Sequence, residues 1–124
     1  MDPVEINAGT WYLRALRADD RIDDRPRLAE LGETDPDYIT MRTAQWESGT
    51  GYSWAVCEPT TGELLAEVTV DPHTARLTTR ARPGYADAAM TAADSVRRFA
   101  AAALNLRLNC PAPPRASRPA SSPD

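Results

Sequence analysis

The stretch that decides the fold reads Ala81-Arg82-Pro83-Gly84-Tyr85-Ala86-Asp87-Ala88-Ala89. It follows a strand-like run over residues 75–80 and opens an alanine-rich helix that we expect to reach about residue 106. The first backbone N–H groups of a helix have no partner within the helix, and the helix dipole adds partial positive charge there. This order of strand, glycine turn and helix predicts a site for phosphate or pyrophosphate; a tight turn that only needs the glycine is the alternative.

The rest of the chain divides into short elements around this helix. Small apolar residues recur on one helical face, at Ala89, Ala92, Ala93, Val96, Phe99, Ala100 and Ala103, so the helix is expected to lie close against a sheet. Alternation and turn residues predict strands over 10–16, 52–58, 63–70 and 75–80, and helices over 25–31 and 36–48. Residues 1–9 are expected to be a loose lead.

Length and composition limit the possible classes of protein. The 124 residues predict one domain over 1–110, followed by a proline- and serine-rich tail over 111–124 that is expected to be disordered. A net charge of −4 argues against nucleic-acid binding, and no apolar run is long enough to span a membrane. The acidic N-terminus does not look like a signal peptide, and two cysteines make no metal motif, so we expect a cytoplasmic protein without a metal.

Three segments resemble the GNAT N-acetyltransferase superfamily, most closely the branch that acetylates ribosomal-protein N-termini. Gly84-Tyr85-Ala86 with the helix behind it is similar to the family's pyrophosphate loop. Residues 13–20 resemble its first strand and the turn that follows, and residues 54–68 resemble a central hairpin. The resemblance implies an α/β fold with a GNAT-like mixed, mainly antiparallel sheet flanked by helices, in the order strand, helix, helix, three strands, helix, strand.

The resemblance also implies an activity and a site. Acetyl-CoA would be the co-substrate, and a small amine or a peptide N-terminus would attack it directly within a ternary complex. The cofactor-binding residues would be Leu77, Thr78, Thr79, Arg82, Gly84, Tyr85, Ala86 and Asp87, the first three through the strand backbone beside the pantetheine arm. Glu67 is the candidate catalytic base, with Glu63 expected on the same strand face; a solvated strand carboxylate is the alternative.

Three positions depart from the family pattern. Ala81 stands where the loop motif begins with Arg or Gln, Arg82 where a second glycine is usual, and Asp87 where Ser or Thr offers a hydroxyl. The carboxylate of Asp87 would repel a pyrophosphate, and Arg80 and Arg82 are the residues expected to compensate. The elements that follow the family's fifth strand also have no counterpart here.

These departures support a rival hypothesis, a catalytically inactive GNAT-like binding or assembly protein; a truncated gene product is a third. The resemblance implies a final strand at 107–110, which would leave an open sheet edge, so we expect a homodimer or a protein partner.

The remaining reactive residue types have structural interpretations beside functional ones. His73 is expected to be a solvated turn residue and Cys57 a small buried strand residue. The tryptophans are expected to form the bulk of the core rather than an acceptor pocket; they are Trp11, Trp46 and Trp54. A solvated loop is expected to contain Arg14, Arg17, Asp19, Asp20, Asp23 and Asp24, with a role in recognising a cationic amine as the alternative.

Overall fold

Six strands form one sheet in the order β1-β2-β3-β4-β5-β6. The computed structural model describes residues 1–109 and 115–116. Its strands are β1 (Ile6–Ala8), β2 (Trp11–Arg14), β3 (Tyr52–Cys57), β4 (Leu64–Asp71), β5 (Arg76–Ala81) and β6 (Arg115–Ala116). Its helices are α1 (Arg25–Glu30), α2 (Tyr38–Ser48) and α3 (Ala86–Ala103). Neighbouring strands are antiparallel from β1 to β5, whereas β6 runs parallel to β5. The mixed, mainly antiparallel sheet with flanking helices confirms the predicted fold class.

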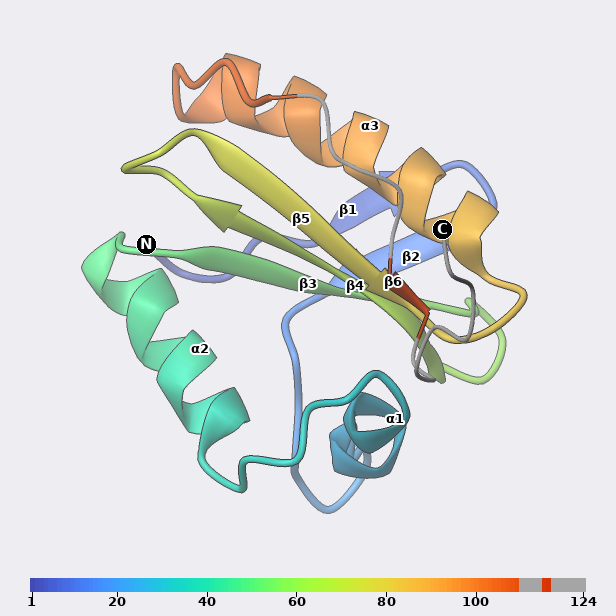
Figure 1. Ribbon diagram of the computed structural model, residues 1–124. Coiled ribbons are helices and arrows are strands. Elements are labelled where there is room, and N and C mark those ends of the chain that lie inside the picture. Colours follow the sequence, from blue (N-terminus) through green and yellow to red (C-terminus); the bar gives the residue numbers. More distant parts are fainter. Residues whose placement is uncertain (110–114, 117–124) are drawn as a thin grey trace, which may run out of the picture.

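The helices cover the sheet on both faces. In Figure 1, α3 lies across one face, and α1 and α2 lie against the other. Strands β4 and β5 alternate accordingly, because successive strand side chains point to opposite faces. Ala66, Val68 and Val70 of β4 contribute to the core beneath α3. The residues between them, Glu67 and Thr69, therefore face α1 and α2, opposite Arg80 and Thr78 of β5.

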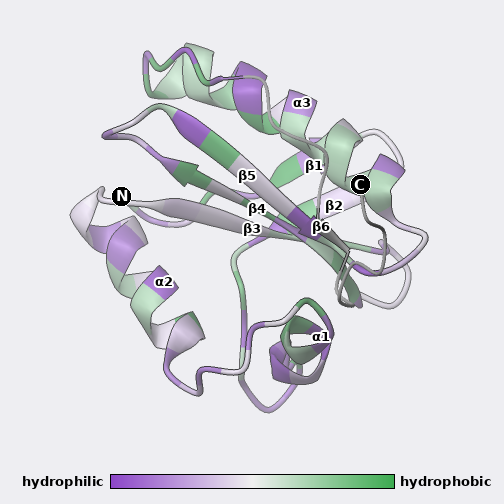
Figure 2. Ribbon diagram, viewed as in Figure 1, coloured by the Kyte–Doolittle hydropathy of each residue, from purple (hydrophilic) through white to green (hydrophobic). Residues whose placement is uncertain are grey.

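The predicted apolar face of α3 is buried except at its C-terminal end, where Phe99 is partly buried and Ala103 is exposed. Ala89, Ala92, Ala93, Val96 and Ala100 have no exposed surface, so the helix backbone approaches the sheet closely. Figure 2 shows α3 mainly in pale green, the colour of hydrophobic residues, interrupted by purple patches. The helix ends at Ala103, three residues before the predicted end.

Aromatic side chains supply the bulk of the core, as expected for the tryptophans. Trp46 of α2 packs edge-to-face on Trp54 of β3, with ring centroids 5.1 Å apart, and Trp54 packs on Phe99 of α3. The Trp46 and Trp54 side chains are almost completely buried. Both indole N–H groups donate to backbone carbonyls, those of Ser53 and Val4, so burial leaves neither unpaired. Trp11 packs against the same core from its partly buried position.

Two predictions near the ends of the chain are wrong: residues 1–9 are not a loose lead, and no strand forms at residues 107–109. Residues 1–9 contain β1, which pairs with β2 across a turn at Gly9, where φ is +62°. Residues 107–109 form no strand, because Leu108 is buried in the core instead of presenting an edge. The strand parallel to β5 is formed by residues 115–116. The predicted tail otherwise lies outside the described residues.

The loop before α1 is not fully solvated, contrary to expectation. The Arg14 guanidinium forms two hydrogen bonds of 2.8 Å to the Asp24 carboxylate, and both side chains are buried. Asp24 also accepts from the backbone N–H of Arg17. Asp24 precedes α1, as predicted, but its carboxylate makes no capping bond, because Arg14 and Arg17 occupy it.

Within the part of the chain that the structure describes, no helix is both long and apolar enough to cross a bilayer.

Candidate functional site

A tight turn joins β5 to α3 at the predicted anion site. The N–H of Tyr85 donates to the carbonyl of Arg82 over 3.0 Å, which closes the turn. Gly84 sits within it at φ +89°, a conformation that costs glycine little and strains residues with a Cβ. The N–H of Arg82 donates to the carbonyl of Leu65, which fixes the turn to β4. The glycine is therefore required by the backbone of the turn.

The N-terminus of α3 next to this turn has free donors. Its N-cap is Tyr85, and no side chain among the described residues caps the helix. The N–H of Ala89 is the first to bond back into the helix, so those of residues 86–88 point out of its end. A Cβ placed on Gly84 would meet no described atom within 4 Å, so the space beside the turn is open as far as residues 1–109 and 115–116 are concerned. An open, uncapped helix end beside a glycine fits a pyrophosphate group.

Neither arginine near the turn is free to neutralise such a group. Arg82 contacts Glu63 at 2.7 Å and Glu30 at 2.9 Å. Arg80 contacts Glu67 at 2.6 Å and Glu33 at 3.3 Å. The expected compensation for Asp87 by these two cations is therefore wrong, because four carboxylates already hold them. Asp87 itself is exposed in the first turn of α3.

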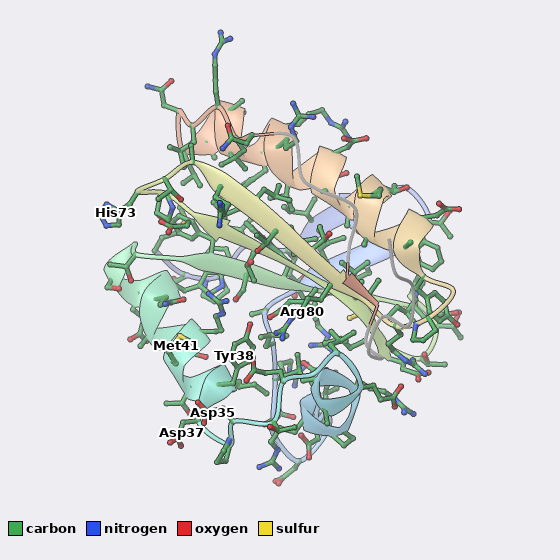
Figure 3. The ribbon with its side chains drawn as sticks, viewed as in Figure 1. Asp35, Asp37, Tyr38, Met41, His73 and Arg80 are labelled. Atoms are coloured by element: carbon green, nitrogen blue, oxygen red, sulfur yellow. The ribbon has the colours of Figure 1, made fainter. Side chains whose placement is uncertain are left out.

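Beneath α2, a buried polar cluster forms around Glu67. The Glu67 side chain is only 2% exposed, and its carboxylate accepts two hydrogen bonds from Arg80 and one from the Tyr38 hydroxyl. Tyr38 also accepts from Arg42 at 3.0 Å and Arg80 at 3.1 Å. Figure 3 shows Tyr38 extending from α2 towards the sheet that carries Arg80. We call Tyr38, Arg42, Glu67 and Arg80 the Glu67 cluster.

The Glu67 cluster keeps its phenol protonated. Burial, followed by the charge of Glu67 and the hydrogen bond to it, raises the pKa of Tyr38 to about 12. A phenolate there would lie against a carboxylate with little water to screen the two charges. Tyr38 therefore acts as a donor to Glu67 at neutral pH. The arrangement orders α2 against β4 and β5.

Comparison with solved structures identifies the architecture. The chain matches a structure described as "a putative ribosomal-protein-serine acetyltransferase from Vibrio cholerae", with a TM-score of 0.67 over 86% of this chain and 72% of that one. The two sequences are 18% identical. No family profile matches this sequence, and no curated protein matches it.

The chain has a GNAT-like fold.

The GNAT-like sheet places the other predicted cofactor residues along β5. Leu77 and Thr79 are buried on the α3 side, whereas Thr78 is exposed on the α2 side. Their backbones follow the edge of the sheet, since β6 pairs only with Arg80 and Ala81 among the described residues. The backbone of residues 77–79 and the turn at residues 82–87 therefore follow each other along one segment at the edge of the sheet.

The two glutamates predicted to share a strand face are separated. Glu67 joins its cluster, but Glu63 precedes β4 and contacts Arg27 and Arg82 near α1. The pairing of β3 and β4 shifts register between Val56 and Cys57, just before this point. The simple alternation used in the prediction does not extend across that irregularity.

His73 and Cys57 have the structural positions expected for them, an exposed turn and a buried strand. His73 lies in the turn between β4 and β5, well away from Tyr38 and Arg80 in Figure 3. Cys57 is a buried free thiol in β3, and burial raises its pKa to about 12. A thiol with so high a pKa is a poor nucleophile at neutral pH. In the described part of the chain, no three of His, Cys, Asp or Glu gather in a way that could hold a metal.

The sequence interpretation missed the contribution of α2 to the site. Tyr38, Arg42 and Gln45 are spaced at i, i+4 and i+7, which places them on one helical face. That spacing was a usable signal, because three polar side chains on a helix face next to a sheet need partners there. The partner residues on β4 and β5 could be named only from the fold.

Proposed function

We propose that this protein is an acetyl-CoA-dependent N-acetyltransferase that acts on a small amine or a peptide N-terminus. The observation that carries the proposal is the open, uncapped N-terminus of α3 beside Gly84, at the end of an edge strand in a GNAT-like fold. Bound acetyl-CoA would supply a thioester whose carbonyl an amine attacks directly in a ternary complex.

The chain's own residues would mainly bind and orient. The backbone N–H groups of residues 86–88 would hold the pyrophosphate, helped by the α3 dipole. The edge of β5 at residues 77–79 would align the pantetheine arm by backbone hydrogen bonds. Holding two reactants in an attack geometry supplies a large part of the rate in such transfers.

Glu67 keeps its place as the candidate base, with a restriction from its surroundings. Arg80 and Tyr38 occupy its carboxylate oxygens, and the side chain is buried. An amine could reach it only if Tyr38 or Arg80 moved. A Glu67→Gln variant that retains full kcat and its pH profile would exclude Glu67 as the base.

Calorimetric titration with coenzyme A and acetyl-CoA tests the proposed site. Gly84→Val should weaken binding at least tenfold, because its side chain would fill the space beside the helix end. Gly32→Val is the matched control: Gly32 has φ +95° and also has nothing within 4 Å of a built Cβ. Both variants should lose comparable stability, but only the first should lose coenzyme A binding.

Two results would contradict the proposal. One is a wild-type protein that shows neither heat nor a thermal shift with millimolar coenzyme A. The other is a Gly84→Val variant that binds as tightly as Gly32→Val does.

The inactive binding or assembly protein remains the second candidate. The observation in its favour is that Arg80 and Arg82 are held by four carboxylates while Asp87 adds a negative charge at the helix end. Asp87→Ser separates the two functions. It should tighten coenzyme A binding in an acetyltransferase, because it removes repulsion and adds a hydroxyl, and should change nothing in a protein that does not bind it.

We also propose that the protein acts in the cytoplasm. A second proposal is that it forms a homodimer or a complex with a protein partner. Light scattering at micromolar concentration measures the assembly directly. A mass near 13.5 kDa without concentration dependence would exclude the homodimer.

A further inference from the structure

A polar pocket lies between α2 and the β4–β5 pair, next to the Glu67 cluster. Its volume is about 230 Å³. It is lined by Arg42, Gln45, Thr50, Gly51, Thr69, Val70, Asp71, Arg76 and Thr78. Two arginines and one aspartate are its charged residues, so the lining carries a net positive charge in a protein whose overall charge is −4.

The Arg42 guanidinium is fixed but has no carboxylate partner among the described residues. Its Nε donates to the Tyr38 hydroxyl over 3.0 Å, and its Nη1 donates to Gln45 Oε1 over 2.8 Å. Both acceptors are neutral, so the positive charge of this half-buried side chain is not compensated. Arg80, by contrast, is paired with two carboxylates.

The backbone supports this arrangement at Gly51. A Cβ at Gly51 would come within 2.7 Å of Gln45 Oε1, the atom that accepts from Arg42. Glycine at this position therefore leaves room for the glutamine that orients the arginine. Two hydrogen-bond partners and a glycine thus fix the position of the Arg42 charge. The guanidinium is held in place, unlike that of a free surface arginine.

The strand wall of the pocket adds further donors. The hydroxyls of Thr69 and Thr78 bond to each other across β4 and β5, so one of them keeps a proton for a ligand. Arg76 lies on the same face of the sheet and forms no ion pair with described residues, although Asp71 is opposite it in the register. Arginine forks and hydroxyls together match a carboxylate.

We propose that this pocket binds the carboxylate of a small ligand, and that the acceptor of the acetyl group is therefore an amine that also bears a carboxylate. The second clause rests on the proposed acetyltransferase function. The volume suits one amino acid or one terminal residue of a peptide. The carboxylate is either the α-carboxylate of a free amino acid or the side chain of an acidic N-terminal residue.

Binding measured without coenzyme A tests the pocket by itself. The probes are L-alanine against L-alaninamide, and Asp-Ala-Ala-amide against Asn-Ala-Ala-amide, followed by calorimetry and by NMR shifts of backbone amides. In at least one pair, the probe with the carboxylate should bind at least about tenfold more tightly than its amide, because a charge-assisted hydrogen bond contributes that much binding free energy. The pair that shows this difference identifies the source of the carboxylate.

Three variants separate the pocket from a general effect of charge. Arg42→Gln and Arg76→Gln should each weaken binding of the carboxylate probe by about tenfold. Arg98→Gln makes the same change in net charge on α3, across the sheet, and should bind as the wild type does. Arg76 is exposed, so its variant should fold even if Arg42→Gln does not.

The outcomes distinguish the two proposals. Equal binding of both members of each pair, no binding of any probe, or equal loss in Arg98→Gln would overturn the carboxylate pocket. Carboxylate binding without coenzyme A binding would keep the pocket and reject the acetyltransferase. Coenzyme A binding without carboxylate binding would keep the acetyltransferase and reject the carboxylate pocket.

Discussion

Replacing Arg80 by methionine should leave the buried carboxylate of Glu67 without its cation. Breaking a buried pair by removing one partner costs about 3–5 kcal/mol. We expect a loss of about 3 kcal/mol, the lower end, because the Arg80 side chain is 26% exposed and Tyr38 would still donate to the carboxylate. With a urea m value of about 1.5 kcal/mol/M, the unfolding midpoint should fall by about 2 M.

Urea unfolding followed by tryptophan fluorescence measures this loss, since Trp46 and Trp54 are buried in the core. Arg97→Met is the matched control: its contact with Asp94 is 3.7 Å long, between side chains that are 39% and 62% exposed. Removing this surface pair should cost less than about 0.5 kcal/mol.

A double-mutant cycle tests whether the two buried charges act together. Glu67→Gln alone should cost about 2 kcal/mol, since it leaves Arg80 with weaker partners. Combined with Arg80→Met, the total should be about 3 kcal/mol rather than about 5, a coupling of about 2 kcal/mol. Costs that add to within about 0.5 kcal/mol would refute the reasoning, because the two side chains would then not share one interaction.

Three other measurements test the core and the buried ionisable groups. In a Cys110→Ser background, the Cys57 thiol should resist thiol reagents at pH 8 until urea unfolds the protein, because burial raises its pKa to about 12; rapid reaction of the native protein would contradict this. Ala92→Leu should lower the unfolding free energy by about 1–3 kcal/mol through overpacking, whereas the exposed Ala101→Leu should change the melting temperature little. The pKa of Tyr38, raised by burial to about 12, contributes stability that is complete below about pH 10 and disappears as the pH rises through about 12. Absorbance titration should show a late phenol ionisation that Tyr38→Phe removes, and a variant with an unchanged titration curve would argue against the buried phenol.

Much of the fold could be predicted because its signals are local. The left-handed Gly49 ends α2 where predicted, with φ +73°, because its own backbone conformation stops the helix. The apolar face of α3 follows from spacing along one helix, and the β3–β4 and β4–β5 hairpins follow from the turn residues between them. The turn at Gly84, proposed as an anion site, is of the same kind, since one strand, one glycine and one helix N-terminus lie within a few residues.

The errors occur where the outcome depends on residues distant in sequence. Arg14 and Asp24 look like loop residues until the fold brings them together in a buried pair. Leu108 looks like a strand residue until the core offers it a place. Neither result can be obtained from local periodicity.

The sequence by itself determined the order of elements from β2 to α3, the buried face of α3 and the glycine turn before this helix, because each depends on neighbours along the chain. Only the tertiary structure decided which charges are free. Arg80 and Arg82 look available to a pyrophosphate in the sequence, but pairing with carboxylates from α1, β4 and the loops beside them removes both. Arg42 shows no such role in the sequence, yet it lines a pocket and has no carboxylate partner in the part of the chain that the structure describes. The energy of a charge depends on what lies within a few ångströms of it, and that is fixed only when strands and helices pack.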